Sequence, residues 1–105
     1  MAPQGGNPLP LLRVRGPSMV PAVRDGDVVV VRYGAVPETG DLVLVRWAAR
    51  PGQLSIKRAR EQRGSGLWQV LGDNQFGSTD SRTLGPAEVL GVVRWRLWPR
   101  PRRLR

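Results

Sequence analysis

The 105-residue sequence contains no cysteine and no histidine, and it has a single lysine, Lys57. Without cysteine and histidine the protein has no thiol nucleophile, no zinc site of the usual kinds and no Ser-His-Asp triad. We therefore expect neither a metal nor a cofactor. Carboxylates, hydroxyls, backbone groups and Lys57 are the groups that remain for chemistry.

Lys57 stands apart from the sixteen arginines that supply the rest of the positive charge. A guanidinium effectively keeps its proton, whereas burial can convert a lysine ammonium into the neutral amine. A lone lysine among arginines is therefore a candidate general base. A biased coding composition that favours arginine is the competing explanation, and composition alone does not separate the two.

The seventeen basic and eight acidic side chains give a net charge of +9. Such a surface attracts anionic lipids, nucleic acids and acidic proteins. No segment reaches the roughly 20 apolar residues of a membrane-spanning helix, and residues 1–10 lack the basic leader and apolar core of a signal peptide. We therefore expect a cytoplasmic protein without a transmembrane segment, at most peripheral at a membrane.

Short runs rich in β-branched residues alternate with turn signals of Gly, Pro and Asp, as is typical of an all-β domain. The predicted fold is a small, mostly antiparallel, partly closed β-barrel or sandwich. Residues 1–10 are expected to be a flexible segment and 11–98 a single domain. The expected strands are Leu11–Arg15, Asp27–Tyr33, Asp41–Trp47, Leu54–Arg60, Leu67–Leu71 and Val89–Trp98.

Three local patterns add expectations to this outline. Val28–Val31 is apolar without alternation, which predicts a central strand buried on both faces. Pro86 suits the first position of a short helical turn over Pro86–Glu88. The tail 99–105 is rich in arginine and is expected to be disordered. It is either solvated or, together with Trp95 and Trp98, in contact with an anionic membrane surface.

Two segments present groups that are suited to proton transfer and nucleophilic attack. Ser18 lies in Gly16–Pro21 between two prolines, which stiffen the loop as a precisely presented nucleophile requires. Around Lys57, strand alternation places Ser55 on the same face as the lysine. Lowering a lysine pKa by about three units costs roughly 4 kcal/mol, which an apolar wall can impose.

A third segment, Leu71–Arg82, is dense in small polar residues. Its ordinary interpretation is a loop whose side chains satisfy its own backbone. It also contains a possible ion pair between Asp80 and Arg82 and a hydroxyl at Ser78, which would suit a rigid shelf beneath an active site.

Together the three segments resemble the serine/lysine peptidases of the type I signal peptidase family, over about Arg15 to Arg94. Gly16–Pro21 is similar to the nucleophile box of that family, Ile56–Arg58 to its lysine box and Gly72–Arg82 to its third box. The resemblance implies that residues 11–98 are a peptidase catalytic domain of mostly antiparallel β architecture. It also implies cleavage of a precursor protein after a small residue.

The same resemblance implies a role for individual residues. Ser18 would be the nucleophile and Lys57 the neutral base, with Ser78 orienting the lysine amine. Asp80 and Arg82 would pair to brace the third segment, and Asp73 and Asn74 would give it structural support.

Two features depart from the larger family members. Gly16 stands where many members carry a serine for the oxyanion hole, and Pro17 has no amide proton, so we expect the backbone amide of Ser18 to be the main oxyanion donor. Only fifteen residues separate Lys57 from Asp73, and no membrane anchor is apparent. In its small size and in the lack of an apparent anchor, the chain looks most like the maturation proteases of nickel-type superoxide dismutase, which remove a short N-terminal leader.

Three alternatives remain open at this point. The protein could process secretory preproteins as a general signal peptidase I does. It could be a self-cleaving repressor-type peptidase, although Gly5–Gly6 is the only small pair before Ser18 and there is no room for a DNA-binding domain. The remote alternative is a basic β-barrel that binds single-stranded nucleic acid through its arginines and four tryptophans.

Overall fold

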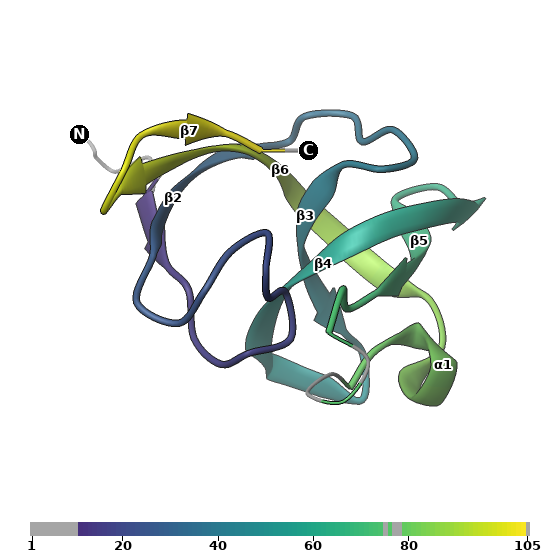
Figure 1. Cartoon of the computed structure of the whole chain (residues 1–105). Coiled ribbons are helices and arrows are strands. Elements are labelled where there is room, and N and C mark those ends of the chain that lie inside the picture. Colours follow the sequence, from purple (N-terminus) through teal and green to yellow (C-terminus); the bar gives the residue numbers. More distant parts are fainter. Residues whose placement is uncertain (1–10, 75, 77–78, 105) are drawn as a thin grey trace.

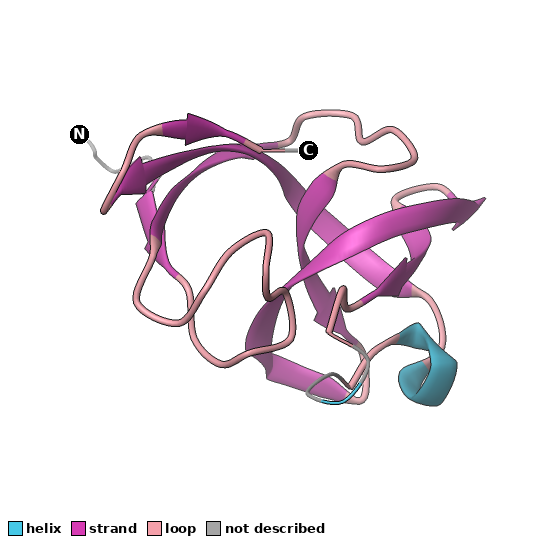
Figure 2. Cartoon of the chain, in the orientation of Figure 1, coloured by secondary structure: helices cyan, strands magenta, loops and turns pink. Residues whose placement is uncertain are grey.

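The computed structural model describes residues 11–74, 76 and 79–104 (Figure 1). Within them α1 is the only α-helix, and strands make up most of the rest (Figure 2). Every strand pairing is antiparallel, so the predicted all-β class is confirmed. The elements are β1 (Leu11–Arg13), β2 (Val28–Tyr33), β3 (Leu42–Trp47), β4 (Arg50–Gly64), β5 (Leu67–Leu71), α1 (Ser81–Leu84), β6 (Ala87–Trp98) and β7 (Arg102–Arg103).

The strands form one sheet in the order β1-β2-β6-β3-β4-β5, with β7 beside β6. β5 also pairs with β6 through Leu67 and Trp68, so β3, β4, β5 and β6 form a ring of pairings. The partly closed sheet that the sequence predicts is therefore confirmed. Figure 1 shows β6 running from the β1, β2 and β7 side of the molecule to the side that holds β3, β4, β5 and α1.

β3 is the central strand, and it separates two apolar clusters. Leu42 and Leu44 face one cluster, whereas Val43 and Val45 face the other, and all four side chains are fully buried. This alternation follows from the two-residue period of a strand. The predicted burial of Val28–Val31 on both faces is wrong, because Val29 and Val31 are buried whereas the other two valines are half-buried.

Two aspartates repeat one local structure at the starts of β2 and β3. Asp27 and Asp41 each follow a glycine, are almost fully buried, and accept a hydrogen bond of 2.9 Å from the amide three residues earlier. Each also lies near an arginine of β6, Arg96 at 3.5 Å from Asp27 and Arg94 at 3.8 Å from Asp41. Charged partners and backbone donors together offset the cost of burying these carboxylates.

Two further expectations need correction. The helical turn predicted over Pro86–Glu88 lies instead at Ser81–Leu84, because Asp80 caps that turn by accepting a hydrogen bond from the amide of Arg82. Ala87 and Glu88 belong to β6.

The predicted disorder of residues 99–105 is wrong for its described part. β7 pairs with β6, and the amide of Leu104 donates a 2.7 Å hydrogen bond to the carbonyl of Arg94. Leu104 is buried in the same apolar cluster as Leu42 and Leu44, and this one apolar side chain anchors an otherwise charged segment. Residues 1–10 lie outside the described part.

Candidate active site

A cleft of about 500 Å³ opens between the N-terminal part of the sheet and the first half of β4. One wall comes from β1 and the loop that follows it, up to Ser18 and Met19. The other wall comes from β4, at Arg50 and from Gln53 to Lys57. The structure therefore brings both Ser18 and Lys57 to a single cleft, although 38 residues lie between them in the sequence.

The Ser18 loop is held from both ends by hydrogen bonds. The amide of Gly16 donates to the Asp25 carboxylate over 2.8 Å. On the other side, the amide of Asn74 donates to the carbonyl of Ser18 over 2.8 Å, and the side-chain amide of Asn74 donates to the carbonyl of Pro17 over 3.1 Å. Asn74 thus links the first and third of the polar segments identified in the sequence.

A second contact, between Met19 and Asp73, also joins the Ser18 loop to the third segment. Met19 is fully buried, and its sulfur accepts a 3.4 Å hydrogen bond from the amide of Asp73. The carboxylate of Asp73 in turn forms a bidentate ion pair with Arg58 of β4, whose guanidinium also donates to the carbonyl of Gly40. Arg58 is a supporting residue to which the sequence pattern assigned no role of its own.

Lys57 is only 3% exposed. It lies opposite Val43 of β3, on the strand face that also carries Ala59, so its side chain is on the side of the apolar cluster that contains Val43 and Val45. Burial lowers the pKa of Lys57, the charge of Asp80 opposes this effect by raising it, and the charge of Arg82 lowers it further. An apolar wall therefore favours the neutral amine, as a general base requires.

Asp80 is nearly inaccessible, and its carboxylate is held by donors from both ends of the third segment. One oxygen accepts from the amide of Gly72 at 2.8 Å, and both oxygens accept from the Arg82 side chain at 3.0 and 2.8 Å. Burial alone would raise the pKa of Asp80, but the hydrogen bonds from Arg82 and Gly72 and the charge of Arg82 lower it to about 2. The expected Asp80–Arg82 ion pair is present.

Not every predicted residue can be placed. Ser78 lies outside the described residues. Its neighbour Thr79 is exposed and lines the cleft, and Ser55 of β4 lines it on the same strand face as Lys57. Ser81 points elsewhere, because its buried hydroxyl accepts a 2.9 Å hydrogen bond from the amide of Val70.

Sequence comparison identifies the class of protein to which this fold and cleft belong. Residues 2–93 match the model of the Peptidase S24-like family, so the chain belongs to that family. It is a serine peptidase of the signal peptidase type.

Two similar proteins are subunits 1a and 1b of the mitochondrial ATP-independent inner membrane protease of Arabidopsis thaliana. The chain is 32% identical to subunit 1a over 82% of its own length and 68% of the relative, and 29% identical to subunit 1b over 80% and 67%. It is also 40% identical to the LexA repressor of Acidothermus cellulolyticus, over 69% of this chain but only 25% of the repressor. Among the described residues, no helix is long and apolar enough to cross a membrane.

Proposed function

We propose that Ser18 and Lys57 form the catalytic dyad of an endopeptidase that removes a short N-terminal leader from a precursor protein. The observation that carries this proposal is that the only lysine of the chain is buried in the cleft that Ser18 also lines. A cation used only for charge would lie in water, where an ammonium is most stable.

The proposed reaction has two stages. The neutral amine of Lys57 removes the proton from the Ser18 hydroxyl, whose oxygen attacks the carbonyl carbon of the scissile bond. The tetrahedral intermediate collapses as Lys57 returns the proton to the leaving nitrogen, which departs with the C-terminal product. Water, deprotonated by the same amine, then hydrolyses the acyl-enzyme and restores Ser18.

The backbone of the Ser18 loop supports one oxyanion donor. The amide of Gly16 is engaged by Asp25, and Pro17 has no amide proton. Among the described residues no hydrogen bond from the amide of Ser18 is observed, so this amide remains for an oxyanion that develops beside the serine. The backbone amide of Ser18, which the sequence also favours, is therefore our proposed oxyanion donor.

The strand edges at the cleft favour an extended substrate. β1 is an edge strand, and residues Leu54–Lys57 of β4 pair only with β3, since pairing with β5 begins at Arg58. Both strands therefore present unpaired backbone groups to the cleft, at which a peptide can add as a strand. We propose the leader of a nickel-type superoxide dismutase precursor as the substrate, supported by the short connection between Lys57 and Asp73.

The test is to incubate the protein with a nickel superoxide dismutase precursor and, separately, with a secretory preprotein, and to identify new N-termini by mass spectrometry. We expect cleavage of the first after a small residue. Ser18→Ala and Lys57→Arg should both abolish it, because arginine keeps the charge but cannot act as a base at neutral pH. Processing by Lys57→Arg at the original rate would rule out the dyad.

The other outcomes identify the alternatives. Cleavage of the secretory preprotein alone would assign general signal peptidase activity. The similarity to a LexA repressor makes self-cleavage a second candidate. Self-cleavage would appear as a shortened chain in the purified protein, and Ser18→Ala would prevent this shortening. Tight, salt-dependent oligonucleotide binding without any peptidase activity would favour the nucleic-acid alternative.

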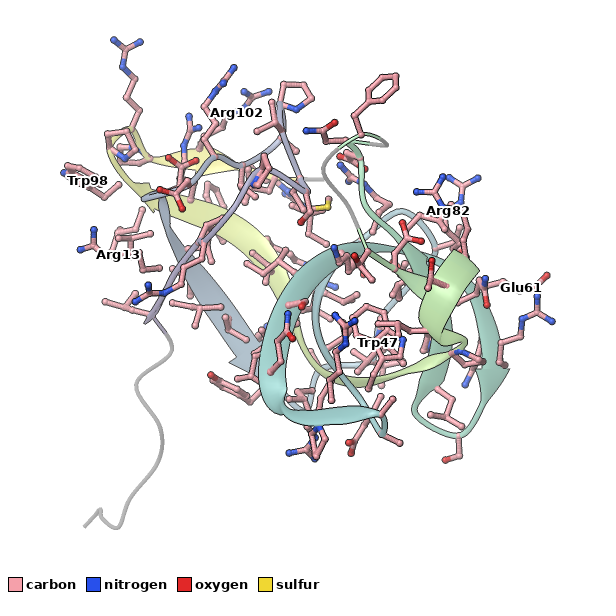
Figure 3. All side chains as sticks on the ribbon, turned by 90° about the horizontal axis from the view of Figure 1, so that it is seen from below. Arg13, Trp47, Glu61, Arg82, Trp98 and Arg102 are labelled. Carbon is pink, nitrogen blue, oxygen red and sulfur yellow. The ribbon has the colours of Figure 1, made fainter. Side chains whose placement is uncertain are left out.

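We further propose that an exposed apolar row lets the protein rest on an anionic membrane. The row consists of Leu11, Val30 and Trp95, which the register places side by side across β1, β2 and β6, with Trp98 at the end of β6. Leu11, Trp95 and Trp98 are 46%, 50% and 57% exposed. Figure 3 shows Trp98 and Arg13 on the same side of the molecule and Arg82 on the other.

Aromatic and basic side chains together suit a membrane interface with anionic lipid. The test is cosedimentation with vesicles of phosphatidylglycerol and phosphatidylcholine, compared with phosphatidylcholine alone. We expect binding to the anionic vesicles only, weakened by Trp95→Ser and Trp98→Ser but not by Phe76→Ser, which removes another exposed aromatic ring. Equal binding of all variants would contradict the assignment. The cytoplasmic location stays a prediction.

A further inference from the structure

The arginines that line the cleft differ from those that form salt bridges. Among the described residues, six salt bridges join six arginines to six acidic residues. The three arginines that line the cleft, Arg13, Arg15 and Arg50, form no salt bridge within the described part of the chain, and all three are exposed. Among the described residues that line the cleft there is no aspartate or glutamate.

The register shows how far these charges lie from the proposed dyad. β1 and β4 run in the same sense, because the four antiparallel pairings β1–β2, β2–β6, β6–β3 and β3–β4 separate them, and four reversals restore the direction. Lys57 lies opposite Val43 and Arg50 opposite Trp47, which places Arg50 four strand positions, or about 13 Å, before Lys57.

The same holds on the other wall. Arg15 and Arg13 precede Ser18 by three and five residues along the chain. The dyad therefore lies at one end of the cleft walls, and the unpaired arginines lie three to five residue lengths back along both walls. A peptide that occupies the space between the walls must pass these arginines on one side of its scissile bond only.

We infer that the cleft selects peptides with acidic residues three to five positions from the scissile bond, on the side that lies between β1 and β4. This inference rests on the proposed function, because the position of the scissile bond is defined by Ser18. Arg15 and Arg50 on facing walls provide two cations for such residues, and the absence of acidic lining means that no protein carboxylate competes for them.

Exposed ion pairs are individually weak. We therefore expect a pair of aspartates at the favoured positions to strengthen binding by about three- to ten-fold at low salt. The preference should fall steeply above about 0.1 M salt, where the Debye length drops below 10 Å.

The experiment measures binding separately from cleavage. Ser18→Ala protein is titrated with labelled peptides built on one precursor cleavage site, and binding is followed by fluorescence anisotropy. The peptides carry no added charge, two aspartates or two lysines, placed three to five residues before the scissile bond or the same distance after it. The expected result is tighter binding for aspartates on one side only, with lysines on that side weakening binding.

A matched pair of variants separates the cleft from net charge. Arg15→Glu with Arg50→Glu should abolish or reverse the preference. Arg32→Glu with Arg60→Glu changes the net charge equally, but these exposed arginines do not line the cleft, so the preference should persist. The neutral variant Arg15→Gln with Arg50→Gln should give a preference between those of the wild type and the glutamate variant. It replaces the glutamate variant as the test if that protein misfolds.

Two results would overturn the inference. One is an equal loss of preference in both charge-reversal pairs, which would show that only the net charge matters. The other is the same affinity for all peptides at low salt. If the binding pattern holds but wild-type protein cuts none of the peptides, the acidic-peptide site stands and the proposed peptidase role of the dyad fails.

Discussion

Replacing Asp80 by asparagine tests how the third polar segment supports the cleft. The substitution keeps the size of the side chain but removes its charge. Asp80 accepts hydrogen bonds from Gly72 and from both the amide and the side chain of Arg82, so a neutral amide cannot satisfy all of these donors. The protein should lose stability at neutral pH.

The magnitude follows from the lowered pKa of Asp80. Its carboxyl has a pKa of about 2 in the folded protein against 3.8 for an ordinary aspartate. Because each pKa unit corresponds to about 1.4 kcal/mol, the ionised carboxylate stabilises the folded state by roughly 2 kcal/mol. A folded pKa below the unfolded one means that this stabilisation is complete above about pH 4 and is lost as the pH falls towards 2.

Urea unfolding of wild type and Asp80→Asn between pH 7 and pH 2 measures this difference. The two free energies of unfolding should differ by about 2 kcal/mol at pH 7 and converge near pH 2. Since the charge of Asp80 raises the pKa of Lys57, the acid limb of the peptidase pH profile should also move to lower pH in the variant. A stability difference that is independent of pH would refute the reasoning.

Three further substitutions test other parts of the structure. Leu104→Ala should cost about 2–3 kcal/mol in urea unfolding because Leu104 is buried, whereas Arg103→Ala should cost less than about 0.5; equal effects would contradict the anchored tail. Gly91→Ala should lower stability by about 1–3 kcal/mol, since an added Cβ would lie 2.8 Å from Cγ1 of Val31, and an unchanged melting temperature would contradict that contact. Lys57→Met should abolish peptidase activity. Because the pKa of Lys57 is lower in the folded state, wild type should gain stability relative to this variant as the pH rises towards 10.5, by at most about 1.4 kcal/mol per pH unit. Parallel stability curves would contradict the lowered pKa.

The sequence predicted the strands well because their burial pattern is local. The expected strand Leu67–Leu71 has the observed bounds, and Ser55 and Lys57 lie on one face of β4, as strand alternation predicts. β4 is longer than predicted because its exposed second half, up to Gly64, is stabilised by pairing with β5 and not by a core of its own.

The errors arose where a distant contact decides the structure. Leu104 lies in a charged segment that does not predict packing, and only the cluster formed by remote strands gives it a place. The ion pair between Arg58 and Asp73 joins residues whose proximity depends on how the third segment folds back on β4. By contrast, the pair Asp80–Arg82 is local, and the sequence was sufficient to predict it.

The central claim is that Lys57 acts as a neutral base, and the composition of the chain makes a direct measurement possible. Since Lys57 is the only lysine, protein labelled with ¹³C-lysine gives one Cε signal, whose pH titration reports this side chain alone. We predict a titration midpoint below 10.5, the ordinary value, that coincides with the acid limb of the peptidase pH profile of the free enzyme. A midpoint at or above 10.5, or an acid limb that does not coincide with it, would contradict the account.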